Sequence, residues 1–171
     1  KGPMETPKGK GVKSINVTAR KTWNTYANKR TFQTLHGVDT VFSKAGIPID
    51  ITVVRENIED TYGGVEHMLT HDVALSRRFI TRPGSLQLVR YAFEMAKLKN
   101  ARRITCGHKA NIMKLTDGLF LECFYEVAKE YPELKADDVI VDDLCMKLVT
   151  RPDTFDVVVL TNLQGDIVSD L

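Results

Sequence analysis

The sequence predicts an α/β protein built on a mixed, largely parallel sheet that is flanked by helices. Short apolar runs at residues 49–54 and 157–160 have the length and composition of buried strands. Between them, residues 85–99 and 115–130 carry apolar side chains three and four positions apart, which predicts two amphipathic helices. Strand and helix patterns therefore alternate along the chain, and this alternation is typical of an α/β sheet.

The composition is that of a soluble globular chain with enough apolar material for a core. Its 171 residues are 43% hydrophobic and 27% charged, which suits one domain or slightly more. A net charge of +2 is too small to indicate a nucleic acid or a membrane surface as partner. No apolar run has the length of a membrane span. The three cysteines lack zinc-type spacing and indicate reduced core thiols.

The first elements surround one central strand. Residues 12–17 alternate apolar and polar side chains, which predicts a half-buried strand, and Thr18 can cap a short helix that ends near residue 26. A further short strand is expected at residues 31–35. The central strand at 49–54 then delivers Arg55 to its carboxyl end, where ligands bind in open α/β sheets.

The middle of the chain is interpreted as an arm followed by helices. Residues 63–83 lack helical periodicity and read as an arm or hairpin, with a strand at 78–81. Ser85 is expected to cap the helix at 85–99. Later, a strand at 139–141 is expected to present Asp142, ahead of a helix at 144–149.

The last stretch carries two carboxylates with i, i+4 spacing. Gly165 permits a turn after the strand at 157–160, and Asp166 is expected to open a helix, so that Asp170 shares its face. Carboxylates at the end of a buried strand can bind Mg²⁺ or Mn²⁺. Spacing alone favours a simpler alternative over a metal site, namely an acidic first turn that complements the helix dipole.

Other possible sites have less support. No G-x-G-x-x-G pattern follows a strand, so the sequence does not predict a Rossmann cofactor site. His67 and His71 are spaced i, i+4 but lack the H-E-x-x-H pattern. Cys106 and His108 could form a thiol–imidazole pair, although a structural role for Cys106 is favoured.

Three arginines give a stronger indication. Arg20, Arg30 and Arg55 follow or flank expected strand ends, and arginine is the side chain best shaped to bind carboxylates with two hydrogen bonds. Each alone could be a solvated surface residue. Together with a tyrosine, a lysine and three aspartates at element ends, they indicate a polycarboxylate bound beside a divalent cation.

Five motifs carry a resemblance to a known family. They are residues 1–7 (Lys-Gly-Pro-Met-Glu-Thr-Pro), 14–20 (Ser-Ile-Asn-Val-Thr-Ala-Arg), 55–64 (Arg-Glu-Asn-Ile-Glu-Asp-Thr-Tyr-Gly-Gly), 108–114 (His-Lys-Ala-Asn-Ile-Met-Lys) and 162–170 (Asn-Leu-Gln-Gly-Asp-Ile-Val-Ser-Asp). In order and spacing, the chain resembles the β-decarboxylating dehydrogenases from end to end, and most of all their isocitrate branch. The resemblance implies the fold of that family, with a β arm or clasp and an incomplete large domain, so we interpret the chain as an internal piece of a longer protein.

The resemblance also implies domains and partners. Residues 1–30 would belong to the large domain, residues 31–62 and 84–171 to a small α/β domain with dimer helices, and residues 63–83 to the arm. The sites would be shared across a homodimer, with Lys109 and Asp142 reaching into the partner's site. The helices at 85–99 and 115–130 are expected to pair with their symmetry mates, since the small sheet has limited area to cover both.

The roles of individual residues follow from the same resemblance. Tyr62 and Lys109 match the catalytic acid–base pair, and Thr6 and Asn111 match positions near the nicotinamide of NAD or NADP. Asp142, Asp166 and Asp170 match the Mg²⁺ or Mn²⁺ ligands. The substrate's carboxylates would be held by Arg20, Arg30 and Arg55, with Ser14 and Asn16 at the carboxylate that distinguishes isocitrate.

Two kinds of alternative remain: a related enzyme with a different substrate, and a protein that is not an enzyme. Isopropylmalate and homoisocitrate dehydrogenases share the same machinery, but an isopropyl group would need an apolar pocket, whereas Ser14 and Asn16 offer hydrogen bonds. A non-catalytic regulatory subunit is the other class of alternative, disfavoured because the catalytic set is present. The resemblance implies a bacterial cytoplasm or a mitochondrial matrix. Without a glycine-rich phosphate loop, the 171 residues alone are expected not to oxidise isocitrate.

Overall fold

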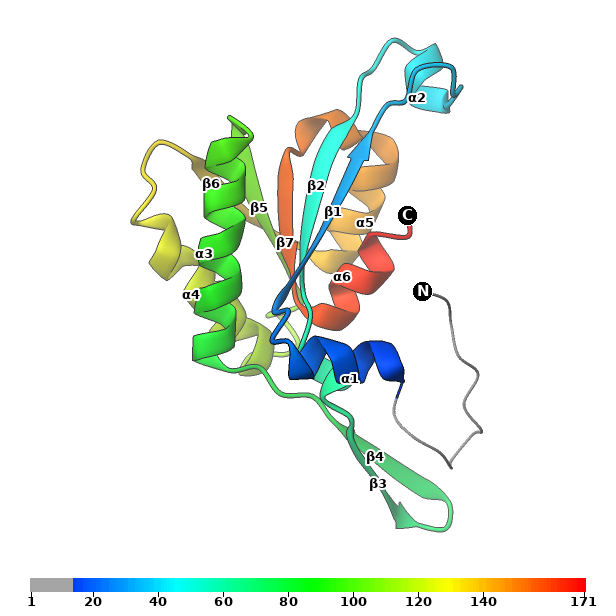
Figure 1. Ribbon diagram of the computed structural model, residues 1–171, viewed down its shortest axis with the longest axis vertical. Helices are drawn as coiled ribbons and strands as arrows, with labels where there is room; N and C mark the ends of the chain where they lie inside the picture. The colour runs from blue at the N-terminus through cyan, green and yellow to red at the C-terminus, as the bar shows by residue number, and fades with distance from the viewer. Residues whose placement is uncertain (1–13) are drawn as a thin grey trace.

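A computed structural model describes residues 14–171 of the chain. Five strands form one sheet in the order β1-β2-β7-β5-β6, with helices on both faces (Figure 1). β1 (Ala27–Gln33) is antiparallel to β2 (Asp50–Glu56), whereas the other strands run parallel to β2, namely β5 (Arg103–His108), β6 (Lys135–Ile140) and β7 (Val157–Leu160). This mixed sheet flanked by helices confirms the predicted fold class.

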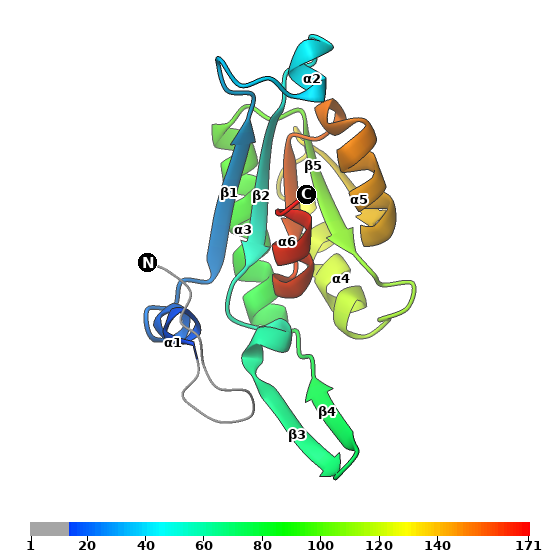
Figure 2. The same ribbon diagram turned by 90° about the vertical axis from the view of Figure 1, so that its right-hand side faces the viewer.

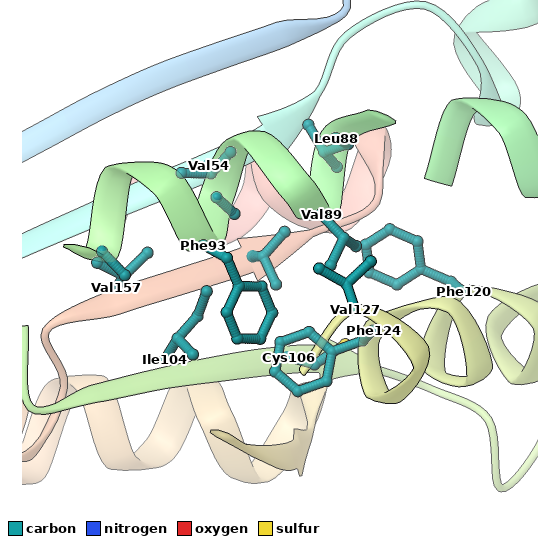
Figure 3. Close-up of a cluster of buried hydrophobic side chains, with 13 residues drawn as sticks. Val54, Leu88, Val89, Phe93, Ile104, Cys106, Phe120, Phe124, Val127 and Val157 are labelled. Carbon is teal, nitrogen blue, oxygen red and sulfur yellow. The ribbon is translucent and has the colours of Figure 1, made fainter. Parts of the chain in front are cut away.

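The sheet separates two apolar cores. α3 (Arg82–Leu98) and α4 (Thr116–Ala128) pack on one face, and α5 (Val141–Thr150) and α6 (Asn162–Val168) on the other (Figures 1 and 2). Figure 3 shows the first core, where the rings of Phe93 and Phe124 lie next to each other and to which Val157 of the central strand also belongs. Val158, the next residue of β7, belongs to the second core. Because β7 is buried on both faces, it is apolar throughout rather than alternating.

The four parallel strands end at one edge of the sheet, which we call the carboxyl edge. β2 leads to the 3₁₀ turn η1 (Asp60–Gly63), β7 leads directly into α6, and β6 leads directly into α5. β5 ends next to Lys109. α1 (Ile15–Thr22) lies by this edge, where Lys21 Nζ donates to the carbonyl of Gly63 at 3.0 Å (Figure 1). The short α2 (Val41–Lys44) lies at the opposite edge, and the 3₁₀ turn η2 (Pro152–Thr154) precedes β7.

A hairpin of β3 (Val65–Thr70) and β4 (Val73–Arg77) extends away from the sheet and helices (Figures 1 and 2). All of its strand residues are exposed. It lies within the stretch for which the sequence predicted an arm or hairpin. At its base the Phe79 ring packs closely on Gly63, where even a methyl group would collide with the ring.

The prediction at the amino end was wrong. Residues 12–17 were expected to form a strand, but residues 15–22 form α1, and residues 12 and 13 lie outside the described part of the chain. An alternation over six residues is too short to distinguish the period of a strand from that of a helix. Asn16 and Arg20, for example, also lie one helical turn apart. The strand expected at 31–35 begins earlier, at Ala27, where β2 offers it hydrogen bonds.

Residues 78–81 were predicted to be a strand and are not one. The Arg78 side chain is held by two buried aspartates, and the Phe79 carbonyl accepts from the Asp60 amide at 3.0 Å, so this segment has no strand partner. α3 then begins at Arg82 rather than at Ser85. Thr81 is its cap, accepting from the Gly84 amide at 3.2 Å, and proline is tolerated in the first turn.

Two later helices also begin earlier than predicted. β6 ends at Ile140 and α5 begins at Val141, so Asp142 lies in the first turn of a helix rather than after a strand. α6 begins at Asn162, and Asp170 follows its carboxyl-terminal cap, Ser169. Asp166 is therefore in the middle of a helix that it was expected to open.

The sheet was expected to be too small to cover both α3 and α4, and this was wrong, whereas the pairing of these helices with their symmetry mates stays a prediction. Their apolar faces are already buried against the sheet and each other, as Leu88, Phe93, Phe120 and Phe124 show with exposures of 0 to 1%. None of the described helices is long and apolar enough to cross a bilayer. The division into domains stays a prediction, although β1 runs across the boundary placed at residue 30.

Candidate active site

Arg55 is the buried centre of the candidate site. It is the sixth residue of β2, and its side chain is 1% exposed. Its Nε and Nη2 donate to Asn162 Oδ1 at 3.0 and 2.8 Å, which fixes the plane of the guanidinium. Its Cζ lies 5.0 Å from the centre of the Tyr62 ring, close enough for a cation–π contact.

Asp166 joins three of the residues that the sequence singled out. Its Oδ1 pairs with Arg55 Nη1 and, at 3.2 Å, with Arg30 Nη2. Its Oδ2 accepts from the Tyr62 hydroxyl at 2.6 Å. These side chains come from β1, β2, η1 and α6, so the carboxyl edge of the sheet brings them together from distant parts of the sequence.

Asp170 lies beside the same group. Its Oδ1 is 3.5 Å from Arg30 Nη1, although its side chain is 78% exposed. Arg30 therefore contacts both carboxylates of the predicted i, i+4 pair. We call Arg30, Arg55, Tyr62, Asp166 and Asp170 the arginine–aspartate cluster.

The electrostatics of the cluster follow from these contacts. Burial raises the pKa of Asp166, but the Tyr62 hydrogen bond and the charges of Arg55 and Arg30 outweigh it and hold that pKa below its ordinary value. Burial and the bond to Asp166 raise the pKa of Tyr62, so its phenol is protonated at neutral pH. Burial lowers the pKa of Arg55, partly offset by Asp166; arginine stays charged nonetheless.

Gly165 allows α6 to approach β2 closely. A Cβ at this position would lie 2.7 Å from Arg55 Cγ and 2.8 Å from Arg55 Cβ. The absence of a side chain at Gly165 is thus what places Asp166 within reach of Arg55.

The predicted residues at the amino end lie on α1 or outside the description. Ser14 is the amino-terminal cap of α1, without a hydrogen bond from its side chain to the helix. Asn16 and Arg20 are half-buried and share a face of the helix. The charge of Arg20 is close enough to contribute to the lowered pKa of Arg55. Thr6 lies outside the described residues.

Lys109 and Asp142 form a second group, separate from the arginine–aspartate cluster. Lys109 Nζ pairs with Asp142 Oδ1, whose side chain is 68% exposed, and Asn111 nearby in sequence is also exposed. The hydrogen bond from Lys109 lowers the pKa of Asp142. The charge that pairs with Lys109 within the described chain is thus that of a carboxylate.

A metal site is only partly formed by one copy of the chain. Among residues 14–171, no three histidine, cysteine, aspartate or glutamate side chains converge as a metal-binding group. Asp166 and Asp170 offer carboxylate oxygens, which are the donors that Mg²⁺ and Mn²⁺ prefer. The donor type therefore fits the predicted ion, while the number of ligands requires at least one further donor.

The thiol–imidazole pair that was weighed at Cys106 and His108 does not form. Cys106 is fully buried in the first core, and burial raises the pKa of its thiol well above the ordinary value. His108 Nε2 instead contacts Asp138 Oδ2 at 2.8 Å, and its Nδ1 accepts from the Ala110 amide at 3.0 Å. Cys106 is a core residue, as favoured from the sequence.

The sequence analysis missed the residues that hold the site together. Asn162 fixes Arg55, and Ser169 accepts from Arg30. Arg78 bridges the buried Asp60 and Asp117 behind the carboxyl edge. The sequence gives no local sign of these roles, and the partners of each residue are too far along the chain to be identified from spacing.

Comparison with known proteins agrees with the geometry. A family model described as isocitrate/isopropylmalate dehydrogenase matches residues 1–171. The chain is 48% identical over 171 residues to an isocitrate dehydrogenase [NADP] of Thermus thermophilus, and 48% identical to a chloroplastic 3-isopropylmalate dehydrogenase of Solanum tuberosum. All of this chain is covered in both cases, but it spans only 34% and 47% of the two relatives.

A solved structure gives the same result for the fold. The crystal structure of isocitrate dehydrogenase from Methylococcus capsulatus matches with a TM-score of 0.92 and 47% sequence identity. The match covers 99% of this chain and 50% of that one. At this identity and coverage, both the fold and the order of the motifs are shared.

Proposed function

Since this chain belongs to the isocitrate/isopropylmalate dehydrogenase family, we propose that it is part of an enzyme that oxidises isocitrate. The products would be 2-oxoglutarate and CO₂, with reduction of NAD or NADP. The arginine–aspartate cluster is the observation that carries the proposal, because it combines carboxylate-binding guanidinium groups, hard oxygen donors and a protonated phenol within hydrogen-bond distance.

The arginines suit a substrate with several carboxylates. Arg30 and Arg55 pair with Asp166 in the chain, and a substrate carboxylate can bind the same donor groups. Arg20 adds a third positive charge from α1. Asp166 and Asp170 would hold a Mg²⁺ or Mn²⁺ ion, whose Lewis acidity supplies stabilisation for negative charge that develops on a substrate oxygen.

Two residues would move protons. Tyr62 keeps its phenolic proton at neutral pH because its pKa is raised, so it can protonate the substrate carbon from which CO₂ has left. Lys109 would accept the proton of the substrate hydroxyl while the nicotinamide receives a hydride. Asn111, and Thr6 outside the described residues, would contact that cofactor.

A homodimer would complete the site. Lys109 and the exposed Asp142 form a group apart from the arginine–aspartate cluster, which supports their delivery to the site of a second copy. The β3–β4 hairpin supports the same assembly, because an isolated two-stranded hairpin is marginally stable in water. We expect the dimer to bury well over ~2,000 Å² in total, as obligate interfaces do.

The polarity of α1 is the reason for proposing isocitrate rather than isopropylmalate as the substrate. Ser14 and Asn16 offer hydrogen-bond donors, whereas an isopropyl group needs apolar contacts. The family includes both activities, so the substrate is the part of the proposal that needs a direct assay. A regulatory subunit is the alternative from another class, and the intact set of Tyr62, Lys109 and three aspartates disfavours it. A bacterial cytoplasm or a mitochondrial matrix is the compartment that we propose.

The test is turnover by the full-length protein with isocitrate, isopropylmalate and homoisocitrate, each with NAD and NADP in the presence of Mn²⁺. Lys109→Met is expected to lower kcat by about 10²–10⁴-fold, as the loss of a general base does, without dissociating the dimer. Lys147→Met is the matched control, because within residues 14–171 Lys147 pairs with Asp143 of its own helix, α5, and with no other acid. A preference for isopropylmalate would contradict the assignment of isocitrate as substrate. An unchanged kcat in Lys109→Met would contradict the assignment of Lys109 as general base. Activity that requires a different subunit would support the regulatory alternative.

A further inference from the structure

A group of buried charges lies behind the carboxyl edge and takes no part in the chemistry proposed above. Arg78 Nε contacts Asp60 Oδ1 at 2.5 Å, and its Nη1 pairs with Asp117 Oδ1. Both aspartates are fully buried, and Arg78 is mostly so. Within residues 14–171, Arg78 is the only cation that pairs with either aspartate. Buried carboxylates are costly when they are unpaired, so this arginine is needed where it lies.

Asp60 holds the turn that carries Tyr62. Its Oδ1 accepts from the Thr61 amide at 2.8 Å, and its Oδ2 accepts from the Leu163 amide at 2.9 Å in the first turn of α6. Its backbone has a φ of +69°, which is uncommon outside glycine. The side-chain bonds hold this backbone in place, two residues before the phenol.

Asp117 holds the turn that carries Lys109. Its Oδ2 accepts from the Lys109 amide at 2.6 Å and from Gln164 Nε2 at 2.8 Å. Gln164 lies in α6, two residues before Asp166. Both aspartates therefore connect a turn at the carboxyl edge to α6, and Arg78 connects the aspartates to each other.

Arg78 also contacts α6 directly through its cap. Its Nη2 donates to Thr161 Oγ1 at 2.9 Å. The flat, branched guanidinium can bind two carboxylates and a hydroxyl at once, which a lysine ammonium on a flexible stem cannot do in the same geometry. The residue also follows β4 directly, so it lies where the hairpin joins the sheet and helices.

We propose that Arg78 is a positioning residue that fixes the Tyr62 turn, the Lys109 turn and α6 relative to one another. The inference rests on the proposed function, since it assigns these turns to acid–base chemistry. If Lys109 acts in the site of a second copy, then Arg78 joins the acid of one site to the base of the other. In the proposal Arg78 does not act on the substrate itself but through the residues that it contacts, chiefly Asp60, Asp117 and Thr161.

The kinetic test compares full-length Arg78→Lys with wild type. A displacement of about an ångström can cost roughly a hundredfold in rate, so we expect kcat to fall by about ten- to a hundredfold. KM for isocitrate should change by less than about threefold, because the substrate arginines lie outside this group. Arg102→Lys is the matched control: Arg102 pairs with Asp156 at the opposite edge of the sheet, and its variant should keep wild-type kcat.

A double-mutant cycle separates positioning from a general loss of stability. Arg78→Lys in a Tyr62→Phe background should lower kcat less than it does in wild type, because one of the two groups that Arg78 positions is already absent. Full additivity of the two effects on kcat would overturn the proposal. A rise in KM with kcat unchanged would also overturn it.

Hydrogen exchange tests the same contacts without any assay of activity. In Arg78→Lys, the amides of Lys109 and Leu163 should lose protection from exchange, while amides of the central strands β2 and β7 keep it. Unchanged protection at Lys109 and Leu163 overturns the proposal even if the wild type is active. The wild type could also prove unable to oxidise isocitrate while Arg78→Lys still loses protection at these amides. Arg78 would then remain the residue that fixes the turns, and the result would count against the proposed function alone.

Discussion

Asp166 illustrates how much one side chain depends on its neighbours. The carboxylate is held by Arg30, Arg55 and Tyr62. Arg55 is almost fully buried, so Asp166 provides the countercharge that makes its burial tolerable. The same carboxylate is proposed to bind a divalent ion, which means that stability and function compete for its oxygens.

Asp166→Asn is expected to lower the free energy of unfolding by roughly 1–3 kcal/mol at neutral pH, because it leaves donors of Arg55 poorly satisfied. The pKa of Asp166 is lower in the folded chain than its ordinary value, so its contribution is complete above about pH 4 and is lost as the pH falls through the folded pKa. Urea unfolding in EDTA at pH 7 and pH 3 measures this.

The difference in the free energy of unfolding between Asp166→Asn and wild type should therefore be smaller at pH 3 than at pH 7. Asp39→Asn is the control, because Asp39 is exposed and only pairs with Lys44 at 3.7 Å. A difference for Asp166→Asn that is equal at both pH values would show that the carboxylate charge does not stabilise the folded chain.

At the scale of elements, the approach of α6 to β2 decides the geometry of the site. The contact depends on Gly165, next to which the Cγ and Cβ of Arg55 leave no room for a Cβ. The Arg55 Cβ would lie 2.8 Å from the added Cβ, and because its place is set by the backbone of β2, a change of side-chain rotamer cannot relieve the strain.

Gly165→Ala is expected to destabilise the protein by about 1–3 kcal/mol, the usual cost of overpacking a core. It should also raise KM for the substrate, because Arg55 is displaced. Gly118→Ala in α4 is the matched control: a Cβ there meets nothing within 4 Å, and replacing a helical glycine should stabilise by about 0.5–1 kcal/mol. Equal stabilities of the two variants in urea would show that α6 is not held against Arg55.

The elements that the sequence predicted well are those whose pattern depends on burial alone. β2 and β7 are apolar because both faces are covered, and α3 and α4 have a stripe that matches the core they contact. Residues 15–17 and 78–81 were misassigned for a different reason. Their conformation depends on contacts with Gly63, Asp60 and Asp117, which no local pattern contains.

The residues of the candidate site likewise divide into those that the sequence identifies and those that depend on distant contacts. Arg30, Arg55, Tyr62, Asp166 and Asp170 were each identified from the sequence, and the structure brings them together. That Lys109 would pair with Asp142, and that Arg78 would join two buried aspartates, could not be predicted. Such pairings depend on which strands are neighbours, and strand order is a property of the completed sheet.

At the scale of the whole molecule, the β3–β4 hairpin has no neighbour within the described part of the chain to cover it. It exposes Val65, Met68, Leu69, Val73 and Leu75 to solvent. Exposed apolar strands of this kind commonly mark an interface. Its base packs at Gly63, next to Tyr62, so a partner that orders the hairpin would also order the turn that carries the phenol.

Replacing residues 65–77 by Asn-Gly is expected to convert the full-length dimer into a monomer at micromolar concentration, measured by sedimentation. The two ends of the hairpin are paired, Val65 with Arg77, so a short turn can join them without moving the sheet. Circular dichroism should show that the fold is kept, and turnover should fall at least about a hundredfold because positioning is lost. A dimer that survives the deletion would assign the interface elsewhere.

The direction of the four parallel strands has a practical consequence for handling the protein. The turns and helices that follow their carboxyl ends carry Tyr62, Lys109, Asp142 and Asp166, whereas the loops at residues 34–40 and 129–134 lie at the other end of the sheet. Gly37 in the first of these loops has open space around it. A tether, a fluorophore or a solid support attached there would hold the molecule with its chemistry facing outward. The direction of the strands thus places a suitable attachment site at the edge of the sheet opposite the candidate site.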